Sequence, residues 1–212
     1  MQSTSFSETG APFSGVLAHQ LLLKEFIHRS ANDFAVACAE VHVAAREIGA
    51  ASARDRLATV VERLHALASI QRLLQPRSEP VMDLGNALCE LCHYHAQARF
   101  AEQGVFVCLR ASDVVIDAQR GWAILMIVSE LLTNAARHAF REPGGMVDVT
   151  AVRRGDELVC VVRDDGVGIE SGVAQRRTGT TIIAELARCA GIELSPRQCP
   201  VGAMFELRAS CR

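Results

Sequence analysis

The sequence lacks the features that mark membrane-spanning, exported and nucleic-acid-binding proteins. No apolar run approaches the roughly twenty residues that a membrane-spanning helix requires. The first fifteen residues are rich in Ser and Gly and hold no basic-then-apolar signal pattern, which argues against secretion. Only 5% of the 212 residues are aromatic and the formal net charge is −2, so nothing indicates nucleic-acid binding. We therefore expect a cytoplasmic protein.

The chain has enough apolar residues for compact cores, with 50% hydrophobic residues at a length that suits two small domains. Its eight cysteines are expected to be free thiols, because the cytoplasm is reducing. Cys89, Cys92 and His93 match the pattern of haem attachment, and His95 could join them around zinc. Haem attachment requires export, however, and a zinc site here lacks a second cysteine pair at finger spacing.

The most informative segment is the helical pattern SELLTNAARHAF, residues 129–140. Glu130, Asn134, Arg137 and His138 lie at i, i+4, i+7 and i+8, so they share one helix face. A carboxylate, an amide and a guanidinium aimed at one place suit a hydrated cation that bridges phosphates, because Mg²⁺ keeps several waters and takes few protein ligands. The opposite side is apolar and is expected to be buried: Ile124, Leu125, Ile127, Val128, Leu131, Leu132 and Ala135.

A second motif, DDGVG, follows a Val-rich strand and runs from Asp164 to Gly168. Gly166 and Gly168 would let the backbone approach a flat or charged group closely. The carboxylate of Asp164 can accept a hydrogen bond from an exocyclic amine such as that of adenine. Asp-Gly is also ordinary turn chemistry, so either motif alone is ambiguous. Together, and in this order, the two motifs favour a nucleotide site.

The two motifs resemble the N box and the G1 box of the GHKL ATPase superfamily, and their fuller wording is similar to that of sensor histidine kinases. The resemblance implies that Asn134 binds Mg²⁺, that Arg137 contacts phosphate where the family usually has Lys, and that Asp164 reads adenine. It also implies that Glu130 occupies the family's acidic position beside the phosphates. The expected nucleotide contacts in these two motifs are Asn134, Arg137, His138, Asp164, Gly166 and Gly168.

Two heptad patterns occupy the N-terminal third. Apolar or small residues alternate at spacings of four and three from Leu23 to Ile48, and a similar run extends from Leu57 to Leu74. Ser52 to Asp55 is a capping-box pattern that would start the second helix. A hairpin of helices at about 15–48 and 53–75 cannot hide both seams by itself. The pattern therefore predicts that two copies associate into a four-helix bundle.

His28 lies beside the first seam, on the flank of the expected bundle. A neutral imidazole can act as a nucleophile near pH 7 and leave a phosphoramidate, and Asn32, one turn later, could orient the ring. Spacing alone gives this histidine little weight, because the chain has seven. The segment HRSAN, however, resembles the phosphoacceptor box of the second histidine-kinase dimerisation subgroup, close to the HWE kinases. The resemblance then covers roughly residues 20–210 and implies that His28 accepts a phosphoryl group.

One family motif is altered. In the family the lid over the nucleotide ends in G-x-G, whose backbone amides hold the triphosphate at a helix N-terminus. Here Gly179 and Thr180 stand at the start of an expected helix, but Arg177 takes the place of the first glycine. Arg177 could supply charge to phosphate, or it could crowd the site and weaken ATP binding. The sequence leaves both possibilities open.

The expected fold class is α+β. A flexible tail (1–15) precedes the dimerisation and phosphotransfer hairpin (16–75), and a linker (76–81) leads to a GHKL-like α/β sandwich (82–212). In the sandwich a mostly antiparallel sheet carries helices on one face. The expected helices are 83–103, 118–140 and 180–190, and the expected strands are 105–110, 113–116, 146–153, 157–164, 192–195 and 203–209.

The function that these expectations support is that of a homodimeric histidine kinase of a two-component system. ATP with Mg²⁺ would phosphorylate His28, with Glu130 and Asn32 assisting, and His28 would pass the phosphoryl group to an aspartate of a response-regulator receiver domain. The input would come from a separate sensor protein or from the tail, because too few residues precede Leu17 for a sensor domain. One alternative, motivated by Arg177, is a histidine phosphotransferase with a degenerate ATP site. Another is a non-catalytic regulator whose GHKL-like domain binds a partner such as a sigma factor.

Overall fold

The computed structural model describes residues 37–39, 41, 43, 51–76, 78–168 and 178–211. The first five of these positions are helical, but the rest of the expected first helix, with His28 and Asn32, lies outside the described residues. Helix α2 (Ala51–Leu73) confirms the expected second helix. Ser52 is already helical, so the expected capping box does not start this helix. None of the helices in the described ranges is both long and apolar enough to span a membrane.

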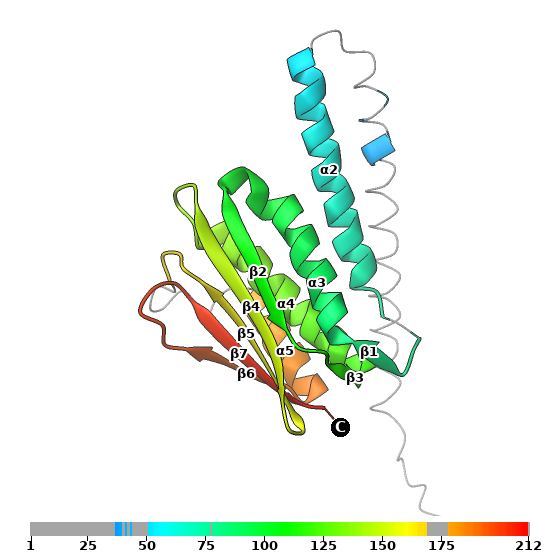
Figure 1. Cartoon of the computed structure of the whole chain (residues 1–212), viewed down its shortest axis with the longest axis vertical. Coiled ribbons are helices and arrows are strands. Elements are labelled where there is room, and N and C mark those ends of the chain that lie inside the picture. The colour runs from blue at the N-terminus through cyan, green and yellow to red at the C-terminus, as the bar shows by residue number, and fades with distance from the viewer. Residues whose placement is uncertain are drawn as a thin grey trace, which may run out of the picture.

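Most of the described chain forms a five-stranded sheet with helices on one face (Figure 1). The strand order is β2-β4-β5-β7-β6. Strand β2 runs parallel to β4, and the other three pairs are antiparallel. The expected mostly antiparallel α+β arrangement is therefore confirmed. The strands are β2 (Val105–Ala111), β4 (Gly145–Arg154), β5 (Glu157–Asp164), β6 (Glu193–Arg197) and β7 (Met204–Ser210).

The helical layer consists of α3 (Leu84–His95), α4 (Ala118–His138) and α5 (Thr178–Ala190). Asp83 begins α3 by accepting a hydrogen bond from the backbone N–H of Asn86, at 3.0 Å. The expected single helix at 83–103 is divided: α3 continues into a π-helical turn, η1 (Ala96–Phe100), and a 3₁₀ turn, η2 (Ala101–Gln103). Gly104 ends it with a φ of 65°, a left-handed conformation that glycine adopts easily.

The core lies between the sheet and this helical layer. Side chains alternate along β4, so Val147, Val149 and Ala151 face the helices and are buried, while Asp148 and Thr150 on the other face are half-buried. The helices contribute fully buried leucines and isoleucines to the same cluster, namely Leu84, Leu88, Leu91, Ile124, Leu125, Ile127 and Leu132. The apolar face expected for residues 124–135 is confirmed, and α4 is the central helix of the core.

A second, two-stranded sheet holds the beginning of α4. Strand β1 (Val81–Asp83), which the sequence did not reveal, pairs antiparallel with β3 (Val115–Asp117). Met82 and Ile116 pack on α4 at Gly121, where an added Cβ would lie 2.9 Å from the Met82 sulfur. Val81, the last residue of the expected linker (76–81), pairs with Asp117 in this sheet.

The C-terminal part of α2 packs on the sandwich itself (Figure 1). Ala66, Ile70, Leu73 and Leu74 belong to the same core cluster as α3 and α4. The indole N–H of Trp122 donates a hydrogen bond to the Leu74 carbonyl at 2.7 Å. Part of the second heptad seam therefore packs on the sandwich of the same chain. The linker does not hold α2 apart from the sandwich.

Candidate functional site

The four polar residues predicted on one helix face occupy the last part of α4. Glu130 and Asn134 are half-buried, whereas Arg137 and His138 are exposed. Thr133 and Ala135, on the other side, are buried. The Asn134 amide makes no hydrogen bond with another described residue. It can therefore offer its oxygen to a ligand or a metal ion.

Asp164 ends β5 and is only 8% exposed. Its Oδ1 accepts hydrogen bonds from the backbone N–H groups of Gly166, at 3.0 Å, and Ala203, at 3.2 Å. Burial raises the pKa of Asp164, while these two hydrogen bonds lower it. Within the described residues Oδ2 accepts no hydrogen bond, so it remains available to a donor such as an amino group.

The loop that follows Asp164 lies directly on the end of α4. The N–H of Val167 donates to the carbonyl of Ala139 at 2.9 Å, and an added Cβ on Gly166 would overlap that carbonyl oxygen. The requirement for glycine at 166 is thus steric. Gly202, which the sequence analysis did not select, has the same role on the other side, because its added Cβ would overlap the Asp164 backbone.

These contacts bring the two predicted motifs together. Asp165 joins them to the sheet, since its Oδ1 accepts a hydrogen bond from the N–H of Met146 at 2.8 Å. Gly168, the last described residue of this loop, has a φ of 80°, a backbone conformation that glycine adopts easily. A buried carboxylate, a glycine-containing loop and a polar helix face therefore meet at the C-terminal end of α4.

The lid is only partly described. Gly179 and Thr180 belong to the first turn of α5, which begins two residues earlier than expected, and Arg177 lies outside the described residues. Helix α5 contacts α4, and its Ile183 and Ala187 are buried in the shared core.

Two residues next to the site were missed or misread from the sequence. His95 was considered a zinc ligand, but it is fully buried and its Nε2 lies 3.0 Å from the hydroxyl of Ser129. Burial lowers the pKa of His95 to about 3. Arg99, in the π-helical turn, was not selected at all, although its charge interacts with the charges of Glu130 and Arg137 on this helix face. Sequence periodicity carries no signal for either contact, because both join segments that are more than thirty residues apart.

The zinc and haem alternatives do not fit this geometry. Cys89 and His93 are exposed, whereas Cys92 and His95 are buried. Burial raises the pKa of the Cys92 thiol to about 12, which disfavours the thiolate that a metal requires. In the described part of the chain no three His, Cys, Asp or Glu side chains are grouped to hold a metal ion.

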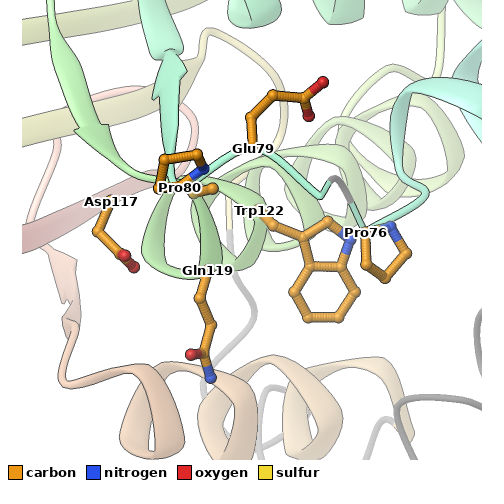
Figure 2. A pocket seen from close by; sticks show the side chains of 7 residues that line it. Pro76, Glu79, Pro80, Asp117, Gln119 and Trp122 are labelled. Carbon is orange, nitrogen blue, oxygen red and sulfur yellow. The ribbon is translucent and has the colours of Figure 1, made fainter.

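A separate hollow of about 270 Å³ lies at the other end of α4 (Figure 2). Trp122 lines it, and the rise of an α-helix puts that residue about 18 Å from Asn134. The hollow is therefore distinct from the meeting point of the two motifs. Its other lining residues are Pro76, Glu79, Pro80, Asp117, Ala118 and Gln119.

The mixed sheet, its helical layer and the two adjoining motifs form one structural unit. Residues 95–191 match the family model of the histidine kinase-like ATPase domain.

Similar proteins include the sensor histidine kinase PdtaS of Mycobacterium tuberculosis (strain H37Rv), which is 25% identical over 166 residues. That alignment covers 77% of this chain and 33% of PdtaS. The chain thus spans about a third of the length of these curated relatives.

Two solved structures share the fold. The histidine kinase domain of the blue-light activated histidine kinase EL346 from Erythrobacter litoralis has a TM-score of 0.56 and 20% identity, covering 92% of this chain and 94% of that domain. A bacterial phosphotransferase has a TM-score of 0.62 and 15% identity, covering 93% of this chain and 98% of the other.

Proposed function

We propose that the protein is a cytoplasmic, homodimeric histidine kinase of a two-component system, which phosphorylates His28 with ATP. The observation that carries this proposal is the state of Asp164. Its carboxylate is almost fully buried, one oxygen is held by two backbone N–H groups, and the other oxygen has no partner in the described residues. A buried acceptor of this kind suits the amino group of adenine.

The nucleotide extends from Asp164 along the polar face of α4. Gly166 lets the loop pack closely on α4, Gly168 brings the loop backbone to the purine, and Arg137 and His138 meet the phosphates. Mg²⁺ fits the amide oxygen of Asn134, which no described residue engages, and it would neutralise phosphate charge and orient the chain of phosphates. The N–H groups of Gly179 and Thr180, at the start of α5, and the side chain of Arg177 complete the phosphate contacts.

The phosphoryl transfer is an in-line displacement. A ring nitrogen of His28 attacks the γ-phosphorus, the bond to the β–γ bridging oxygen breaks, and ADP leaves as the N–P bond forms. Asn32 orients the imidazole, and Glu130 occupies the acidic position beside the phosphates. Positioning and charge neutralisation supply most of the rate in such transfers. Phospho-His28 then gives its group to an aspartate of a receiver domain docked on the bundle formed by two hairpins.

The test is incubation of the purified chain with γ-labelled ATP and Mg²⁺, with the label scored as acid-labile and base-stable phosphate. His28→Ala should abolish labelling, and Asn134→Ala should reduce its rate by about a hundredfold, the size expected for losing one charge-stabilising contact. His93→Ala, which removes an exposed imidazole from α3, is the matched control and should label normally. Equal labelling of the His28→Ala protein would overturn the proposal.

A histidine phosphotransferase without ATP chemistry is the second candidate. Arg177 in place of a lid glycine favours it, and the fold shared with the bacterial phosphotransferase is compatible with it. Nucleotide titration separates the two candidates. Saturable Mg·ATP binding that is lost in Asp164→Asn supports the kinase. No ATP binding, with phosphate still accepted from a phosphorylated receiver domain, supports the phosphotransferase. ATP binding without phosphorylated His28 supports the non-catalytic regulator.

A further inference from the structure

The position of Arg99 follows from two hydrogen bonds that join the α3 extension to α4. His95 Nε2 lies 3.0 Å from Ser129 Oγ, and Gln103 Nε2 donates to the Ala136 carbonyl at 3.3 Å. The paired residues are 34 and 33 positions apart, so the two helical segments run in the same direction and in register. Arg99, midway between His95 and Gln103, therefore lies beside α4 at about Thr133. It is thus level with the interval between Glu130 and Arg137.

Phe100, the residue after Arg99, holds this turn in place. Phe100 is fully buried, and its ring packs edge-on against Phe140 with 6.4 Å between the ring centres. A π-helical turn such as η1 is rare and is often found at functional sites. Arg99 itself is half-buried, and its Nε is inaccessible and has no hydrogen-bond partner among the described residues. A buried N–H group without an acceptor is costly, so this atom indicates an acceptor that the described chain does not provide.

The charges around Arg99 leave an excess of positive charge. Arg63 of α2 is also near, but its guanidinium pairs with Glu102 at 2.5 Å and its Nε donates to the Ala98 carbonyl. Burial lowers the pKa of Arg99, the charge of Arg137 lowers it further, and Glu130 raises it. Two guanidinium groups, those of Arg99 and Arg137, thus act with the single carboxylate of Glu130.

We infer that Arg99 is a phosphate-binding residue, which forms with Arg137 a two-arginine subsite for the terminal phosphates of the nucleotide. This inference rests on the proposed function for its ligand. A planar guanidinium recognises phosphate oxygens through paired hydrogen bonds, and two such groups suit a ligand with several negative charges. The simpler role, an ion pair that only orients Glu130, predicts a different result in the following experiment.

The experiment is calorimetric titration of the full chain with ATP, ADP and AMP in the presence of Mg²⁺. Arg99→Gln should weaken ATP binding by about tenfold, the loss expected for one charge-assisted contact. ADP binding should weaken less, and AMP binding should not change. Arg110→Gln is the matched control. It removes an exposed arginine from β2, whose guanidinium lies 3.7 Å from the carboxylate of Asp148, and it should leave all three affinities unchanged.

Equal weakening for ATP, ADP and AMP, or no weakening, would overturn the assignment of Arg99. An ion pair that only orients Glu130 predicts one of these two results. If Arg99→Gln does not fold, as judged by its thermal melt, Arg99→Lys carries the test. Lysine keeps the charge but not the planar fork, so ATP should still lose affinity relative to AMP.

Inorganic tripolyphosphate separates this inference from the proposed function. Binding of tripolyphosphate that Arg99→Gln weakens and Asp164→Asn does not, in a chain that binds no ATP, would support the subsite and contradict the kinase. ATP binding that depends on Asp164 but not on Arg99 would support the kinase and contradict the subsite. A chain that binds neither ligand would contradict both.

Discussion

The two parts of helix α4 have different surroundings. From Gly121 to Leu132 every residue except Met126 and Glu130 is buried, because α3, α5, β5 and the small β1–β3 sheet all contact this helix. In the last six residues, 133–138, only Thr133 and Ala135 are buried. One helix thus anchors the core with its first part and presents a polar face with its last. Substitutions in the two parts should therefore affect different properties, stability in the first and ligand binding in the second.

The largest expected effect on stability is in the first part. Leu125 is fully buried, so Leu125→Ala removes buried surface and leaves a cavity, and the free energy of unfolding should fall by about 2–5 kcal/mol. Asn134→Ala, nine residues later on the same helix, removes a half-buried amide that bonds to no described residue and should change it by at most about 0.5 kcal/mol. Urea denaturation measures both values. A loss in Asn134→Ala as large as that in Leu125→Ala would show that the last turns are also structural.

An intermediate effect is expected where the glycine loop meets the end of α4. In Gly166→Ala the added methyl group would overlap the Ala139 carbonyl, so the loop must shift and lose the Val167–Ala139 hydrogen bond. We expect a loss of about 1–3 kcal/mol in the free energy of unfolding, together with weaker nucleotide binding. Val167→Ala trims an exposed side chain in the same loop and should change stability by less than about 0.5 kcal/mol. If both variants behave alike in urea denaturation, the close packing at Gly166 does not matter.

The sequence predicted best what depends on local periodicity. The apolar stripe from Ile124 to Ala135 located α4, and the Val-rich run ending at Asp164 located β5 within a residue. The juxtaposition of the Asp-Gly loop and α4 was expected from the combination of the two motifs and from the resemblance to a known family. The physical cause, the absence of a side chain at Gly166 opposite Ala139, becomes apparent only in three dimensions.

Contacts between distant segments were not predictable in this way. The parallel pairing of β2 with β4 joins strands about forty residues apart, and β1 is only three residues long. The seam of α2 has the same pattern whether it faces a second copy or its own sandwich, so the contact of Ile70 and Leu74 with the core was missed. Arg99 was not selected, because a helical period of 3.6 residues does not reveal a π-helical turn.

The smallest expected effect depends on pH and concerns His95, which packs against the first part of α4 through Ser129. The unfolded chain binds a proton at this histidine near its ordinary pKa of 6.5, but burial lowers the pKa in the folded chain to about 3. Between these values the unfolded state holds more protons, so lowering the pH destabilises the fold. From about pH 7 to about pH 5.5 the free energy of unfolding should fall by about 1 kcal/mol because of His95.

His95→Gln keeps a polar group beside Ser129 but does not titrate, so its free energy of unfolding should fall by about 1 kcal/mol less over this range. Urea denaturation of both proteins at the two pH values measures the difference, and identical pH dependence would show that His95 can be protonated within the folded chain.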